Sequence, residues 1–258
     1  NKYILETTDG IEKVDRKHPW PTWLEPIVEL NRTLGAMPLV GGNSSKLHWD
    51  YEESIAAMTQ AVDQATKYVH VEFYILALDD TTAGFFDALE NAIKRGVVVR
   101  VLMDHIACLR NPGFRKTKKR LTTMGAQWHL MLPVQPLRGK WQRPDLRNHR
   151  KLVVLDGLVA FTGSQNMVDS SYDKKSNIRR GLHWKDLMVR FEGPIVAGIN
   201  ALFVTDWYSE TDELLLREAP DVDPVHTREP LDAQVVPSGP GFEGENNLRL
   251  FNSLMYAA

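Results

Sequence analysis

Segments with helical spacing of apolar residues alternate along the chain with runs that are mostly apolar. The helical spacing is clearest over residues 51–67 and 82–95, where apolar side chains recur every three or four positions. Each of these segments is followed by a run of β-branched and aromatic residues, at 69–78 and 97–103. Strands that are apolar on both sides are typical of a sheet buried between layers of helices. The pattern therefore predicts an α/β fold with helices on both faces of the sheet.

The same criteria predict the remaining elements. Further helices are expected over residues 20–34, 115–124, 194–208 and 247–256. Further strands are expected over residues 126–132, 151–155, 158–162, 186–191 and 233–236. Gly41-Gly42-Asn43 predicts a turn, because glycine and asparagine together interrupt regular structure.

The order of these elements indicates one complete unit and the beginning of another. Residues 36–210 hold the regular alternation of helices and strands. Residues 1–35 precede it, with an amphipathic stretch that suits either a membrane interface or packing on the domain. Residues 211–231 are acidic and contain proline, which is typical of a linker. Residues 232–258 are expected to be the truncated start of a second similar unit, because they are too short to bury a core of their own.

Composition limits the class of protein. Of the 258 residues, 43% are apolar and 25% are charged, as in a soluble globular domain. The single cysteine, Cys108, excludes an internal disulfide and a cysteine-rich zinc site. The formal net charge of −2 conceals an asymmetry, because residues 105–151 carry twelve lysines and arginines against one acid, Asp145. This basic stretch suits either an anionic ligand or a solvated surface.

The basic stretch ends in a set of polar residues at fixed spacing, H-x-K-x4-D-x6-G-S-x-N, which begins at His149 and ends at Asn166. His149 and Lys151 are two positions apart at the start of a predicted strand, so their side chains project from one face. The Asp156-Gly157 pair predicts a tight hairpin. The hairpin returns the chain so that Ser164 and Asn166 lie beside the first pair.

These side chains form a group that suits a tetrahedral phosphate. The lysine neutralises charge, and the hydroxyl and amide donate hydrogen bonds. The imidazole can attack phosphorus or move a proton. Gly163 leaves room for a close backbone approach. The sequence therefore predicts chemistry on a phosphodiester.

The motif and its flanks resemble the phospholipase D superfamily, and in particular the N-terminal catalytic half of bacterial cardiolipin synthases. The resemblance extends to the segments Glu72-Phe73-Tyr74-Ile75, Arg147-Asn148-His149-Arg150-Lys151, Trp184-Lys185-Asp186-Leu187, Asp206-Trp207 and Val236-Pro237-Ser238-Gly239. It implies a phospholipase D-like mixed sheet flanked by helices on both faces. It covers the chain from about residue 36 to its end.

The resemblance also implies roles for the residues of the motif. His149 matches the nucleophile that forms a phosphatidyl-histidine intermediate. Lys151, Ser164 and Asn166 match the groups that hold the phosphate. Asp186 matches a carboxylate that accepts a hydrogen bond from the second nitrogen of the histidine and fixes its tautomer.

Three further residues are expected to act around this group. Asp156 matches a residue that supports the hairpin rather than touching substrate, and Arg147 and Arg150 are expected to bind the substrate phosphate or headgroup. No metal and no cofactor is implied, because lysine and amide donors stabilise the charge. Glu72, an acid within a buried strand, either pairs with a basic group or orders the site.

The expected function is that of a cardiolipin synthase, which transfers a phosphatidyl group between two phosphatidylglycerol molecules and releases glycerol. The resemblance implies a second half with its own histidine, so this soluble piece is expected to be inactive unless that half or another copy joins it. Anionic membrane lipid is the expected partner, at the cytoplasmic face of the cell membrane, and no nucleic acid is expected. The alternatives are a phosphodiesterase acting on phospholipid or nucleic acid, and a non-catalytic module that binds anionic lipid.

Overall fold

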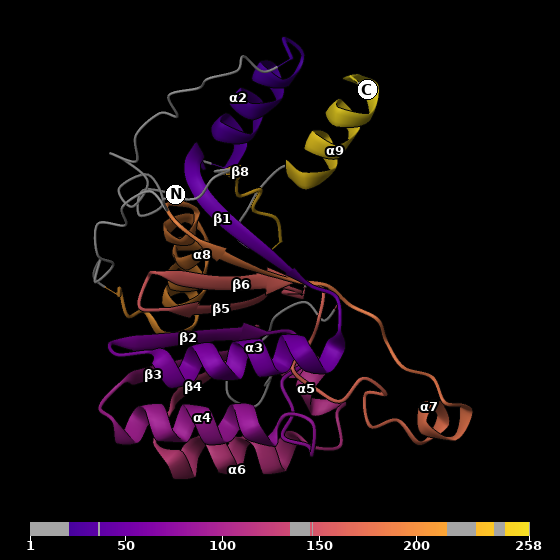
Figure 1. Ribbon diagram of the computed structural model, residues 1–258. Coiled ribbons are helices and arrows are strands. Elements are labelled where there is room, and N and C mark those ends of the chain that lie inside the picture. Colours follow the sequence, from indigo (N-terminus) through magenta and orange to yellow (C-terminus); the bar gives the residue numbers. More distant parts are fainter. Residues whose placement is uncertain are drawn as a thin grey trace.

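The computed structural model describes residues 21–35, 37–134, 145, 147–215, 231–239 and 246–257. The described strands form one mixed sheet in the order β4-β3-β2-β5-β6-β7-β1-β8 (Figure 1). The strands are β1 Leu39–His48, β2 Tyr68–Phe73, β3 Val98–Asp104, β4 Gln127–Met131, β5 Lys151–Leu155, β6 Val159–Gly163, β7 Met188–Glu192 and β8 Leu231–Gln234. The helices are α2 Leu24–Gly35, α3 Tyr51–Gln64, α4 Ala83–Lys94, α5 His105–Leu109, α6 Phe114–Met124, α7 Lys175–Arg180, α8 Ile195–Thr211 and α9 Asn246–Ala257.

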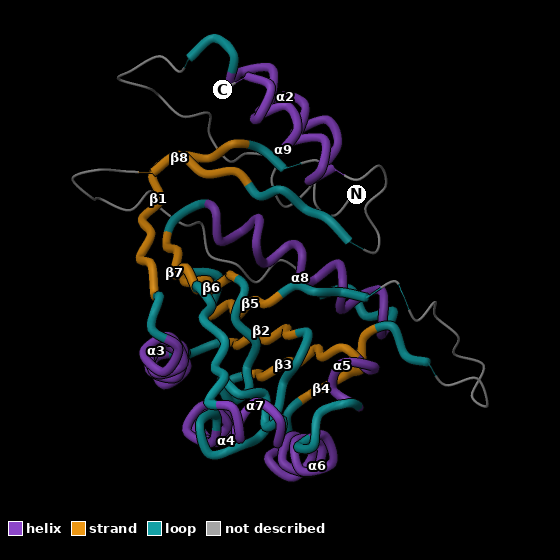
Figure 2. The backbone as a smooth tube through the Cα atoms, turned by 90° about the vertical axis from the view of Figure 1, so that its right-hand side faces the viewer, coloured by secondary structure: helices purple, strands orange, loops and turns teal. Residues whose placement is uncertain are grey.

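Helices cover both faces of the sheet, as predicted (Figure 2). Strands β2, β3 and β4 run parallel and are connected through α4 and α6, whereas β5 to β8 and β1 pair antiparallel. One core lies between the sheet and α3, α4 and α6, and a second core lies between the sheet and α8. Every residue of β2 and β5 is buried, His70, Glu72 and Lys151 included, which explains why the apolar residues of these strands are not confined to one face.

The predicted turn at residues 41–43 is wrong, because β1 runs through it. Gly42 has a φ of 70°, and the pairing of β1 with β8 shifts register between Val40 and Asn43. The glycines therefore form a bulge inside a long strand, where one residue leaves the ladder and the chain bends. In β1, the pairing with β7 on one side and β8 on the other outweighs the local turn preference.

Several strand boundaries also differ from the prediction, and one of them differs for a reason that concerns the motif. The strand predicted over residues 69–78 ends at Phe73, because the Ile75 amide donates to the Asn166 side chain and the Ala77 amide to the Met167 carbonyl. The strand predicted from residue 186 begins at Met188. The short helices α5 and α7 were not predicted.

The strand expected to open a second unit lies in the same sheet as the rest. β8 pairs antiparallel with β1 at the sheet edge, and α9 lies beside α2 (Figures 1 and 2). The proposed division of the chain at residues 35, 210 and 231 stays a prediction. Residues 1–20 and most of the expected linker lie outside the described part. None of the described helices is both long and apolar enough to cross a bilayer.

Candidate active site

The hairpin between β5 and β6 forms as predicted and carries the motif at its open end. Asp156 and Gly157 have φ values of 54° and 72°, and the Leu158 amide donates to the Leu155 carbonyl. The Asp156 carboxylate accepts four hydrogen bonds of 2.8–2.9 Å, from three consecutive amides at 66–68 and from the Thr66 hydroxyl. Burial alone would raise the pKa of Asp156, but these donors outweigh it and the pKa is lowered. Asp156 thus fixes the turn to the start of β2.

His149 lies at the mouth of the hairpin, with its ring stacked on Tyr74. The two ring centroids are 3.8 Å apart and the planes are inclined by 19°. Tyr74 directly follows β2, and the β2–β5 register sets Phe73 opposite Lys151, which brings the two rings together. The Lys151 ammonium donates to the His149 carbonyl and lies 5.3 Å from the Tyr74 ring centroid. The imidazole and the ammonium therefore share one aromatic neighbour.

The electrostatics of this pair favour a neutral imidazole. Burial lowers the pKa of His149, and the positive charges of Lys151 and Arg147 lower it further, while Asp104 opposes them. Burial also lowers the pKa of Lys151, and the Asp186 carboxylate partly offsets that effect. A neutral imidazole keeps a lone pair, which a nucleophile requires.

Ser164 and Asp186 form the opposite side of the group. The Ser164 hydroxyl donates to Asp186 Oδ1 at 2.7 Å and accepts from the Leu187 amide at 3.1 Å. Asp186 Oδ2 is buried and has no hydrogen-bond partner among the residues that the structure describes. The described contacts of Asp186 do not include the hydrogen bond to His149 that the resemblance implies, so its contact with the site runs through Ser164. A Cβ at Gly163 would lie 2.1 Å from the Leu187 carbonyl oxygen, which shows that this glycine makes room for the chain entering β7.

Asn166 is nearly buried, with 6% of its surface exposed, and both polar atoms of its side chain make a hydrogen bond. Its Oδ1 accepts from the Ile75 amide at 3.0 Å, and its Nδ2 donates to the Tyr172 hydroxyl at 2.9 Å. These bonds tie the end of β6 to the segment that holds Tyr74. Asn166 therefore lies in the site and also holds the segment with Tyr74 in place.

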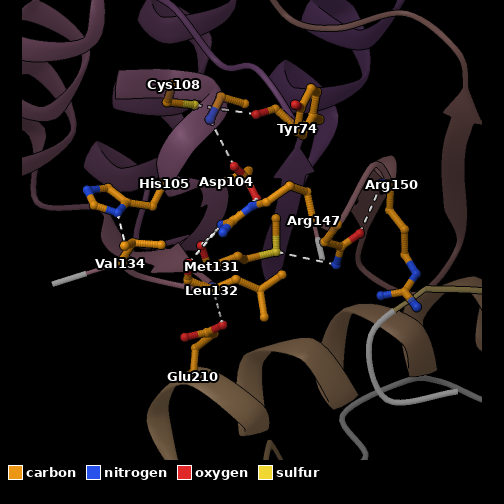
Figure 3. Close-up of polar contacts among 12 residues, drawn as sticks. Tyr74, Asp104, His105, Cys108, Met131, Leu132, Val134, Arg147, Arg150 and Glu210 are labelled. Carbon is orange, nitrogen blue, oxygen red and sulfur yellow. Dashed lines mark hydrogen bonds and ion pairs between the residues drawn. The ribbon is translucent and has the colours of Figure 1, made fainter. Parts of the chain in front are cut away.

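Arg147 is held by buried groups at the ends of β3 and β4 (Figure 3). Its guanidinium forms an ion pair at 2.8 Å with Asp104 and donates to the carbonyls of Met131 and Leu132. Only 6% of the Arg147 side chain is exposed, and none of that of Asp104. These contacts do not support the expectation that Arg147 binds substrate, and they make it an anchor for the chain leading to His149.

Arg150 is likewise engaged within the protein. Its guanidinium forms an ion pair with Asp206 of α8 and donates to the Ser238 carbonyl at 2.7 Å. Asn148 donates to the same Asp206 carboxylate at 2.8 Å and to Glu72 at 2.9 Å. The expected role of Arg150 in binding phosphate therefore lacks support. Both residues that flank His149 are fastened to α8, and His149 itself is left exposed between them.

Glu72 belongs to this network through Asn148, whose side-chain amide donates to it. Among the described residues this contact, and not an ion pair with a cation, connects Glu72 to the site. Burial raises the pKa of Glu72 well above its ordinary value, and the Asp206 carboxylate raises it further, while Arg150 opposes the shift. These shifts favour the neutral form of the Glu72 carboxyl group. Tyr74 and Asp206 are functional neighbours to which the sequence reasoning gave no role. Both lie in segments that carried the resemblance, and only the three-dimensional contacts show what they do.

The comparisons with known proteins agree with this geometry. Residues 58–192 match the family described as cardiolipin synthase, PLD-like domain. The chain belongs to this phospholipase D-like family. The match contains the whole hairpin, Tyr74, and the segment through Asp186.

Curated relatives and a solved structure extend the comparison. Cardiolipin synthase A of Proteus mirabilis is 33% identical over 98% of the chain and 52% of the relative, and that of Pectobacterium carotovorum is 32% identical over 85% and 45%. The chain thus spans about half the length of the curated relatives it matches. NucT from Helicobacter pylori shares the fold, with a TM-score of 0.51 and 12% identity, over 65% of this chain and 98% of that one. This phospholipase D-like chain has, among its described residues, no cluster of histidine, cysteine and acidic side chains able to hold a metal ion.

Proposed function

We propose that this chain is the catalytic half of a phosphatidyltransferase that makes cardiolipin from two molecules of phosphatidylglycerol. The single observation that carries the proposal is the placement of His149. Its ring is exposed, stacked on Tyr74, and held beside the Lys151 ammonium, and its flanking residues are fastened to α8. The family match and the relatives named cardiolipin synthase A support the choice of a lipid phosphodiester as substrate.

The chemistry follows from these groups. A neutral His149 nitrogen attacks the phosphorus of the first phosphatidylglycerol, and the bond from phosphorus to the glycerol oxygen breaks. The glycerol oxygen takes a proton and leaves, and a phosphatidyl-histidine remains. The terminal hydroxyl of the second phosphatidylglycerol then attacks phosphorus, loses its proton, and releases neutral His149 and cardiolipin. Two phosphatidylglycerols thus give one cardiolipin and one glycerol.

Each neighbouring residue has a proposed part. The Lys151 ammonium stabilises the negative charge that builds up on the phosphate oxygens in the transition state. When substrate binds, the Ser164 hydroxyl turns its single proton from Asp186 to a phosphate oxygen. Asn166 keeps Tyr74 and the end of β6 in register. Asp156 keeps the hairpin closed and takes no part in the chemistry.

The proton for the leaving glycerol comes, in this proposal, from a second histidine outside this chain. The length of the relatives supports this, because the chain spans about half of each. Residues 36–210 would form the first unit and residues 211–231 a linker. Residues 232–258 would belong to the start of the second unit. We place the complete protein at the membrane surface, where both lipid substrates reside.

The test is a product assay of the full-length natural protein with phosphatidylglycerol in detergent micelles. We expect cardiolipin and free glycerol in equal amounts, and no cardiolipin from the His149→Ala variant. His129→Ala serves as the matched control, because that histidine is exposed on the edge strand β4. Formation of phosphatidic acid in place of cardiolipin would identify a hydrolase, and cleavage of single-stranded DNA with lipid untouched would identify a nuclease. Either result would overturn the proposal.

A further inference from the structure

Residues 173–187, here called the α7 excursion, leave the site after Tyr172 and return to β7. The excursion stands away from the sheet and from the helices that cover it (Figure 1). Its helix α7 contains no buried residue, and all residues from 178 to 185 are exposed. Nothing in the described part of the chain covers its outer surface.

The excursion is nevertheless a built element. The Asn177 side chain donates to the Ser171 carbonyl at 2.9 Å, and the Trp184 amide donates to the Ser170 carbonyl at 2.9 Å. The Ser170 hydroxyl lies 2.8 Å from His183 Nδ1. These bonds close the base of the excursion, so its outer side chains are held in a defined arrangement.

The outer side chains include an unusual share of large apolar groups. Ile178 is 58% exposed, Leu182 is 43%, Trp184 is 57% and Leu187 is 41%. Single apolar residues on a surface need no explanation, but a gathered set within ten residues indicates a surface that another phase or molecule covers.

The same segment is strongly basic. It carries five lysines and arginines, and it has no acid between positions 174 and 185. The basic residues are Lys174, Lys175, Arg179, Arg180 and Lys185. Exposed isoleucine, leucine and tryptophan among basic residues are the composition of elements that lie in a membrane interface. The core of a protein interface is depleted of lysine, and nucleic-acid binding does not call for exposed leucine and isoleucine.

Both ends of the excursion rest on the motif. At one end the Tyr172 hydroxyl accepts from Asn166, and at the other end Asp186 accepts from Ser164. A lipid whose tails remain in the bilayer under the excursion would therefore present its headgroup close to His149. This geometry orients the site toward the layer that holds an amphiphilic phosphodiester.

We propose that the α7 excursion docks on the surface of an anionic phospholipid bilayer, with its apolar side chains among the headgroups and its cations against the lipid phosphates. The link to catalysis rests on the proposed function, but the docking itself does not. The experiment therefore measures binding of the chain to lipid vesicles and not enzymatic activity.

The experiment measures partitioning of the chain to sedimented vesicles of phosphatidylglycerol and phosphatidylcholine in equal parts, and to vesicles of phosphatidylcholine alone. We expect binding to the anionic vesicles that weakens with salt. Arg179→Glu with Arg180→Glu should weaken it at least about 30-fold, since each cation near such a surface contributes about fivefold. Ile178→Ser with Leu182→Ser should weaken it about tenfold, through lost burial of apolar surface.

Two matched controls isolate the surface. Arg115→Glu with Lys119→Glu makes the same charge change on α6, and Leu158→Ser removes an exposed leucine at the turn of the hairpin. Both should bind like the unchanged chain, as should His149→Ala, which separates docking from catalysis. Thermal melting by circular dichroism checks that each variant is folded. Equal loss of binding in the α6 variant, or unchanged binding in both α7 variants, would overturn the proposal.

Discussion

Asp156, the acid of the motif, has a structural role that can be tested separately from catalysis. The residue is 7% exposed, and its carboxylate accepts four hydrogen bonds from residues 66–68, at the start of β2. One hydrogen bond to a charged group contributes roughly 1.5–3 kcal/mol. Four bonds that share one carboxylate are not additive. We therefore expect Asp156→Ala to lower the free energy of unfolding by about 3–5 kcal/mol, including roughly 1 kcal/mol for alanine at a positive φ.

The Asp156→Asn variant should lose only part of this unfolding free energy. Asparagine tolerates the φ of 54° and keeps one acceptor oxygen, so we expect a loss of about half that size, roughly 1.5–3 kcal/mol. Urea unfolding followed by circular dichroism gives both values. Asp63→Ala is the control, because Asp63 is exposed on α3 and its removal should change stability by less than about 0.5 kcal/mol.

The effect of pH has a fixed sign. The pKa of Asp156 is lowered in the folded protein, so its contribution is present above the unfolded value of 3.8 and is lost as pH falls through the folded value. The difference between the unchanged chain and Asp156→Asn should therefore shrink in acid. A stability change below about 1 kcal/mol for Asp156→Ala, or loss of catalysis at unchanged stability, would refute the structural role.

Two further predictions concern the residues around His149. Tyr74→Leu removes the ring that stacks on the imidazole, so it should lower the rate of phosphatidyl transfer about tenfold or more and shift the acidic limb of the pH–rate profile. Tyr74→Phe keeps the stacked ring and should change neither the rate nor the profile. Equal effects of both variants would exclude stacking as the cause. Glu72→Gln should cost less than about 1 kcal/mol, because burial and the Asp206 carboxylate raise the pKa of Glu72 and so favour its neutral form. Asp206→Asn should cost about 2–4 kcal/mol by leaving the Arg150 cation without its carboxylate. Urea unfolding measures the second pair, and a larger cost for Glu72→Gln would mean that Glu72 is charged.

The parts of the site that the sequence could predict are those that depend on local chemistry. The Asp156-Gly157 pair specifies a hairpin whatever surrounds it, and a two-residue spacing puts His149 and Lys151 on one face. The helices on both faces also follow from period and burial alone. The family was recognisable for the same reason, since its motif lies within one hairpin and the turn after it.

The parts that could not be predicted depend on partners far away in sequence. The basic stretch suggested free arginines, but the carboxylate that engages Arg147 comes from the end of β3 and the one that engages Arg150 comes from α8. The stacking of Tyr74 on His149 requires the register of β2 against β5, which no local pattern encodes. The glycines at 41–42 have a local preference for a turn, but strands on both sides of β1 override it.

The central claim is that His149 becomes covalently bonded to phosphorus during turnover. Rapid acid-free quenching of the full-length protein with phosphatidylglycerol, followed by peptide mass spectrometry, tests this most directly. The account predicts a phosphatidyl group on His149 that is labile to acid and that disappears once the phosphatidylglycerol has been consumed. A covalent phosphatidyl group on another residue, with His149 unmodified, would contradict the account.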